Sequence, residues 1–116
     1  MSYEFKSFFE NLVLLEGVKV FQHEEEPNTW VFFSCDSQYS MALITAMAEE
    51  IGDDSICKLV SLTHPVDSEK TAFQIVFHED KERILKVFSA RIKQFLERQR
   101  EPKYDQYGVP DLSLVQ

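Results

Sequence analysis

The chain has 116 residues, of which 44% are apolar, and a formal net charge of −8. This length fits one domain, and the apolar share excludes a largely disordered chain. No apolar run is longer than four residues, the length of the run at residues 12–15, whereas roughly 20 are needed to cross a bilayer, so we expect no membrane partner. The N-terminal residues lack the pattern of a secretory signal, which favours a cytoplasmic protein.

The charges are segregated along the chain. Residues 1–80 hold 15 of the 20 carboxylates and four of the 12 cations, whereas the remainder has a positive net charge. Such a division affects association and solubility rather than the fold. It indicates that charged surfaces of this protein meet a partner.

The first predicted element is a helix with one buried face. Its apolar side chains recur at helical spacing, at Phe5, Phe8, Phe9 and Leu12. Ser2 is placed to cap the N-terminus of this helix, and Gly17 is placed to stop it.

A β-hairpin is expected next, with strands over residues 18–23 and 29–35. In the first strand, Val18, Val20 and Gln22 should share one face. The second strand is apolar on both faces around Trp30 and Phe32, which is typical of a central strand covered on both sides.

A second helix and a second hairpin follow. Asp36 or Ser37 can cap the helix, and Gly52 can end it. Extended runs over residues 56–62 and 70–78 then predict two strands. Alternation in the latter run places four side chains on one face, namely Thr71, Phe73, Ile75 and Phe77.

The last predicted element is an amphipathic helix over residues 80–99, which Pro102 terminates. The element order is therefore α-β-β-α-β-β-α. It predicts a single α+β domain over residues 1–100, with an antiparallel sheet and helices packed on it.

Residues 101–116 form a C-terminal extension in which we expect no regular structure, because Pro102, Gly108 and Pro110 interrupt it. We expect the extension to dock either on the domain or on a second protomer, along a sheet edge or in a groove. Its apolar anchors would be Leu112, Leu114 and Val115.

No motif for catalysis, metal binding or cofactor binding is present. The three glycines are too far apart for a phosphate-binding loop, and the three histidines lack the spacing of a metal pair. Cys35 ends a predicted strand just before a helix, where a thiol can be activated. However, Asp36 beside it disfavours the thiolate, so we expect a structural thiol, no cofactor and no enzyme activity.

The charged candidates for partner binding form an acidic and a basic set. Glu24, Glu25 and Glu26 can steer a basic partner, or they can serve solubility alone. Arg83, Lys86 and Lys93 lie on the polar side of the last helix. We do not expect this helix to bind nucleic acid, because no aromatic residue is interleaved on its polar face and its stripe of cations is interrupted by Glu82, Glu97 and Glu101.

The order of elements over residues 3–99 resembles that of type III secretion chaperones and their YbjN-like relatives, and it is also similar to the roadblock fold. The chain has one strand fewer than the chaperones before the middle helix and one fewer than roadblock after it. Both families are dimeric, non-catalytic binding scaffolds, so the resemblance implies a dimeric adaptor or chaperone.

We therefore expect a non-enzymatic protein-interaction domain that binds itself as a homodimer and also another protein. One alternative is a small regulatory or sensing module that holds a small ligand between the sheet and the helices. Its lining would include Trp30, Phe32, Phe73 and Phe77. Another alternative is a cysteine-dependent enzyme that uses Cys35.

Overall fold

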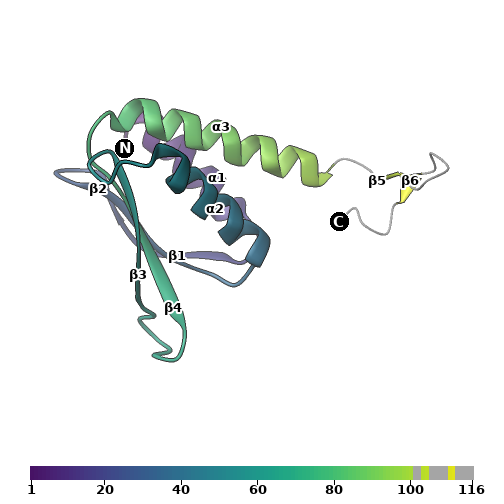
Figure 1. The fold of residues 1–116 in the computed structure, drawn as a ribbon, viewed down its shortest axis with the longest axis horizontal. Coiled ribbons are helices and arrows are strands. Elements are labelled where there is room, and N and C mark those ends of the chain that lie inside the picture. The colour runs from purple at the N-terminus through teal and green to yellow at the C-terminus, as the bar shows by residue number, and fades with distance from the viewer. Residues whose placement is uncertain (101–102, 105–109, 112–116) are drawn as a thin grey trace.

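The computed structural model describes residues 1–100, 103–104 and 110–111, with side chains up to Gln99. The predicted α+β order α-β-β-α-β-β-α is confirmed (Figure 1). Its elements are α1 (Tyr3–Leu14), β1 (Val18–Glu24), β2 (Thr29–Cys35), α2 (Gln38–Ile51), β3 (Cys57–Thr63), β4 (Thr71–Phe77) and α3 (Lys81–Arg100).

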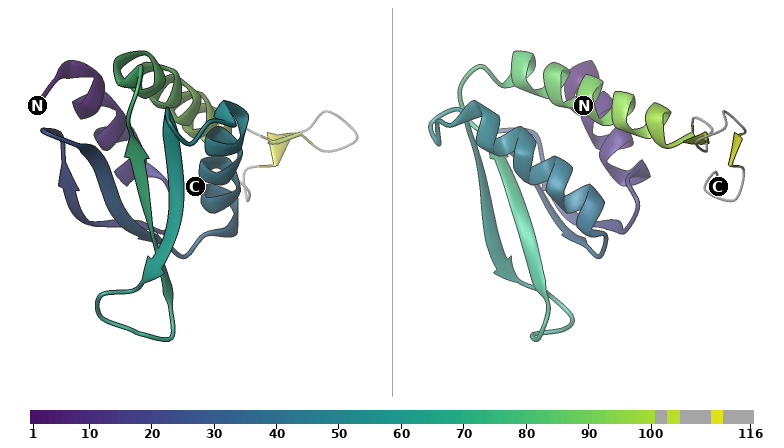
Figure 2. Two further views of the ribbon diagram at one scale, coloured as in Figure 1. Left: turned by 60° about the vertical axis from the view of Figure 1, so that its left-hand side comes forward. Right: turned by 45° about the vertical axis from the view of Figure 1, so that its right-hand side comes forward.

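The first four strands form one antiparallel sheet in the order β1-β2-β4-β3, so β2 and β4 are central and β1 and β3 are the edges. The three helices lie on the same side of this sheet (Figure 2). The domain therefore has two layers, one of helices and one of strands.

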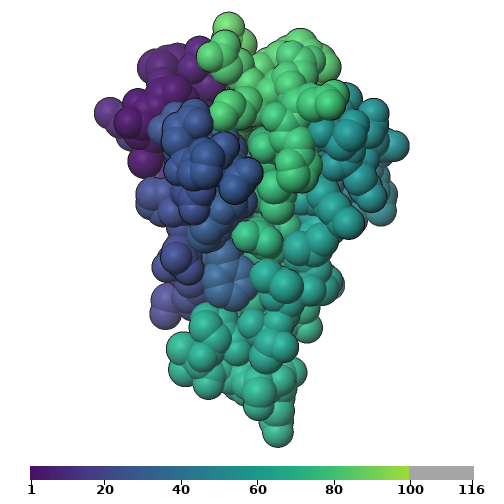
Figure 3. Space-filling view, turned by 90° about the vertical axis from the view of Figure 1, so that its left-hand side faces the viewer, coloured from purple at the N-terminus to yellow at the C-terminus, as the bar shows by residue number. Residues whose placement is uncertain are grey.

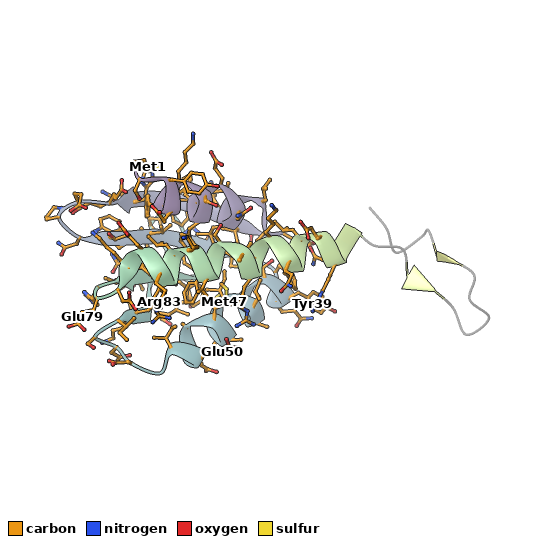
Figure 4. All side chains as sticks on the ribbon, turned by 90° about the horizontal axis from the view of Figure 1, so that it is seen from above. Met1, Tyr39, Met47, Glu50, Glu79 and Arg83 are labelled. Carbon is orange, nitrogen blue, oxygen red and sulfur yellow. The ribbon has the colours of Figure 1, made fainter. Side chains whose placement is uncertain are left out.

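Within the helical layer, α3 lies between α1 and α2, as the view from above shows (Figure 4). Toward α1, the hydroxyl oxygens of Ser7 and Ser89 are 2.6 Å apart, which is possible because both side chains are small. Toward α2, Arg91 forms an ion pair with Glu50. The long third helix thus joins the other two.

The core between the layers is built from aromatic side chains that meet from three elements. Phe8 of α1, Phe77 of β4 and Phe88 of α3 are each at most 2% exposed. The ring centroid of Phe77 lies 5.2 Å from that of Phe8 and 5.8 Å from that of Phe88. This cluster fixes α1 and α3 to the sheet at one point.

The predicted helix boundaries follow from local hydrogen bonds. The Ser2 hydroxyl accepts from the backbone N–H of Phe5, and the Ser37 hydroxyl accepts from that of Ser40, so both serines act as N-caps. Gly52 ends α2 in the left-handed conformation, as expected. Ser37, rather than Asp36, is the cap of α2.

The predicted alternation in β1 is wrong beyond Val20, because a β-bulge shifts the register between Val20 and Gln22. Gln22 is consequently paired with Phe32 on the side away from the helices. His23 takes the core-side position opposite Val31, and its ring centroid lies 4.7 Å from that of Phe9.

No helix in the described part of the chain is long and apolar enough to span a membrane. In the C-terminal extension, β5 (Lys103–Tyr104) pairs with β6 (Pro110–Asp111). The predicted anchors Leu112, Leu114 and Val115 lie outside the described residues.

Candidate interaction surface

The face of the sheet that points away from the helices carries apolar side chains. In β2, Val31 and Phe33 are fully buried on the helical side, and Trp30 and Phe32 therefore project to the opposite side. The prediction that β2 is central is confirmed, whereas the prediction that both of its faces are covered is wrong. All three helices lie on one side of this sheet, so they leave its other side uncovered.

Strand register defines which residues share this outward side. Directly paired residues lie on the same face of a sheet. Trp30 is paired with Val76, and Phe32 with Gln74. We call the outward side the open face; its members are Lys19, Gln22, Glu24, Trp30, Phe32, Ser34, Lys58, Val60, Leu62, Ala72, Gln74 and Val76.

The open face is accessible to solvent. Leu62 is 41% exposed, and Trp30, Phe32, Val60 and Val76 are partly exposed. In Figure 3 this side of the molecule shows β1, β2, β4 and β3 in that order, as bands from purple-blue through blue and green to teal. The tip of the β3–β4 hairpin protrudes at the lower end.

One end of the open face is bordered by the loop between β3 and β4. The His64 Nδ1 atom accepts hydrogen bonds from the backbone N–H groups of Val66 and Asp67, at 3.1 and 3.0 Å. The His64 ring packs edge-on to Phe21, with 5.0 Å between centroids, and Phe21 in turn contacts Phe32. The apolar surface therefore continues from β2 onto the hairpin loop.

The predicted acidic set is largely engaged with its own chain. Glu25 accepts a 2.6 Å hydrogen bond from the backbone N–H of Ser2, and hydrogen bonds from Ser2 hold the pKa of the Glu25 carboxyl below its usual range. Glu26 pairs with Lys81 at 3.2 Å. Glu24 differs, because it sits on the open face opposite Trp30.

The predicted basic set is divided between two places. Arg83 pairs with Asp80 at the start of α3. Lys86 and Lys93 instead border a shallow groove of about 290 Å³ between α1 and α3. The remaining lining of this groove comes from Tyr3, Glu4, Ser7, Ser89 and Ala90.

The two thiols lie in surroundings that favour the protonated form. Burial raises the pKa of the Cys57 thiol to about 12. Cys35 is half-buried; burial above all, and the neighbouring Asp36 as well, raise its pKa, against an opposing hydrogen bond with the backbone of Ser37. Since the thiolate is the nucleophile, this site does not activate Cys35.

The four aromatic residues proposed to line a ligand site are on different sides of the sheet. Trp30 and Phe32 are on the open face, whereas Phe73 and Phe77 point toward the helices. Phe73 packs against Phe33, with ring centroids 5.9 Å apart. These residues therefore do not surround one cavity.

Sequence reasoning assigned Trp30 and Phe32 to the lining of a ligand site and missed the open face as a surface for protein interaction. A strand that is apolar on both faces fits a strand covered on both sides. It fits equally a strand whose outer face is exposed and associates with another protein. The number of helices was the available signal, because three helices cannot cover both faces of a four-stranded sheet and still pack on one another.

Comparisons of the chain with models of protein families, with characterised proteins and with solved structures found no match. The resemblance based on element order therefore stays an expectation. The candidate surface has to be judged by its own geometry and chemistry.

Proposed function

We propose that this protein is a non-enzymatic, cytoplasmic protein-interaction domain, an adaptor or chaperone-like scaffold, that self-associates through its open face. The observation that carries the proposal is the position of Trp30 and Phe32 on the central strand β2, on a sheet face that none of the described helices covers. The solvent side of an antiparallel sheet is normally polar. Here the two central strands place an aromatic pair and Val76 on that side.

Burial of this face provides a driving force for association. Complete transfer of an exposed Phe or Val side chain from water contributes about 1.5–3 kcal/mol, and the partly exposed residues of the open face retain a fraction of that. Large aromatic side chains at the centre of a patch are also the usual hot spots of protein interfaces. A second copy of the chain is the occupant that we propose.

A dimer formed in this way leaves the helical layers of both protomers on the outside. The groove between α1 and α3, with Lys86 and Lys93 at its border, is then available to another protein. Acidic side chains on that protein would complement the two lysines. This arrangement fits an adaptor, in which one face assembles the protein and another recruits a partner.

The proposal is tested with the double variant Trp30→Thr/Phe32→Thr, because threonine preserves strand propensity while removing the aromatic surface. We expect a concentration-dependent dimer for the wild type. The variant should weaken dimerisation by about 100-fold or more, since each hot-spot truncation costs roughly 2 kcal/mol. Sedimentation equilibrium measures the change, and circular dichroism verifies folding.

The matched control is Val13→Thr/Val87→Thr, which removes exposed apolar surface from α1 and α3 instead. These valines are 41% and 42% exposed on the helical layer. The control should dimerise as the wild type does. A wild type that stays monomeric at all accessible concentrations, or a control that is as impaired as the open-face variant, contradicts the proposal.

A further inference from the structure

The groove between α1 and α3 has a floor of small side chains. Ser7 of α1 lies against Ser89 of α3, with their hydroxyl oxygens 2.6 Å apart, and the exposed Ala90 follows on α3. All three line the groove of about 290 Å³ that Lys86 and Lys93 border. Because small side chains at a contact let helix axes approach closely, this floor can receive another helix.

The serine pair at this floor has one hydroxyl proton more than it uses. Each serine hydroxyl carries one proton, and the contact between Ser7 and Ser89 takes only one of the two. The side-chain amide of Asn11 donates to the Ser89 hydroxyl at 2.8 Å and so accepts no proton from it. Neither hydroxyl has a further acceptor among the residues that the structure describes. The spare proton is therefore available to an acceptor that enters the groove.

Two lysines flank the serine pair along α3. Lys86 and Lys93 are seven residues apart, which is two helical turns or about 10.5 Å. Both are exposed, and neither takes part in an ion pair among the residues that the structure describes. Glu4 is the one acid in the described lining, so the lining is positive although the whole chain has a net charge of −8. A partner segment with two carboxylates has complementary charge.

The walls of the groove favour a helical partner over an extended one. Backbone groups within α1 and α3 are hydrogen-bonded inside their own helices, so the walls offer no ladder to an added strand. A helix satisfies its own backbone groups and needs only side-chain contacts. Its residues seven positions apart lie on one face at the same spacing as Lys86 and Lys93.

We infer that this groove binds an acidic helix of another protein. Two carboxylates seven positions apart on that helix contact Lys86 and Lys93, and a polar residue between them accepts the spare proton of Ser7 and Ser89. The inference rests on the adaptor role proposed above and names the chemistry of the recruited partner. Exposed ion pairs are weak individually, so the affinity is modest and falls as salt is raised.

A synthetic helix tests the inference. The probe is a peptide of about 20 alanines and glutamines, with two glutamates seven positions apart and a serine midway. In a titration followed by ¹⁵N NMR at low salt, it should shift the amide signals of Ser7 and Ser89. Lys86→Gln/Lys93→Gln should weaken binding about tenfold. Ala90→Leu keeps the charge but fills the floor at an exposed helical position, and it should prevent binding.

Two controls separate this geometry from general attraction. Lys58→Gln/Lys70→Gln removes the same charge from exposed positions of the β3–β4 hairpin and should leave binding unchanged. A version of the peptide with prolines between the acids cannot form the helix and should not bind. Equal losses in the two lysine variants, equal binding of the proline peptide, or no shifts in the groove up to millimolar peptide would each overturn the inference.

The open-face variant Trp30→Thr/Phe32→Thr distinguishes this inference from self-association. It should bind the peptide as the wild type does, because the groove lies on the helical layer. A monomeric wild type that binds the helical peptide refutes self-association and supports the groove. A wild type that dimerises through the open face but does not bind the peptide refutes the groove alone.

Discussion

Phe88→Ala is expected to lower the free energy of unfolding by about 3–5 kcal/mol, the usual cost of truncating a buried Phe to Ala. The side chain is 2% exposed and contacts Phe77, and its ring centroid also lies 6.4 Å from that of Phe8. The cavity would open where α1, α3 and β4 meet, so all three elements lose packing. Since domains of this size have a total stability of about 5–15 kcal/mol, the variant should unfold at much lower denaturant concentration.

The control for this prediction is the neighbouring Val87→Ala. Val87 is on the same helix but 42% exposed, so its truncation should change the free energy of unfolding by no more than about 0.5 kcal/mol. Urea titration monitored by circular dichroism compares both variants with the wild type. A loss below about 1 kcal/mol for Phe88→Ala would contradict the aromatic cluster as the centre of the core.

Gly17→Ala should be the second most damaging substitution, with a loss of about 2–4 kcal/mol from backbone strain and steric overlap. Gly17 has a φ of +76°, and a β-carbon there would lie 2.6 Å from the backbone nitrogen of Ser37. Its carbonyl also accepts a 3.0 Å hydrogen bond from the N–H of Asp36. The turn before β1 is thus held tightly against the start of α2. A β-carbon added at residue 17 must push this turn away from Ser37.

Gly52→Ala separates the two causes. Gly52 has a similar φ of +63°, but a β-carbon there would meet only the Glu49 carbonyl oxygen at an ordinary 3.6 Å. Replacing Gly52 with alanine should lower the free energy of unfolding only through the strain of the left-handed backbone conformation, by about 1 kcal/mol. Thermal or urea unfolding of both variants provides the comparison. Equal losses at Gly17 and Gly52 would show that the approach of residue 17 to Ser37 does not matter for stability.

Much of the fold was predictable because its determinants are local. The spacing of Phe5, Phe8 and Leu12 defines one helical face regardless of what packs on it, and the serine caps act within three residues. The alternation of Phe73, Ile75 and Phe77 likewise identified the core side of β4 correctly. Element order and fold class follow from such patterns.

The candidate surface was harder to predict, since it depends on contacts between distant elements. Alternation shows that Trp30 and Val31 point in opposite directions, but it does not show which direction the helices cover. The bulge after Val20 has no strong signal in the sequence, yet it moves Gln22 to the open face. The set of residues on the open face is defined only once β1, β2, β4 and β3 have been placed in order.

The most direct test of the open face as the site of self-association is the fluorescence of Trp30, the only tryptophan in the chain, as protein concentration increases. Because Trp30 is on the central strand β2 and projects from the open face, dimerisation should bury its indole ring. We predict that its emission shifts to the blue and becomes less sensitive to acrylamide quenching over the same concentrations at which sedimentation reports the dimer. A dimer that forms without any change in Trp30 emission or quenching would contradict the account.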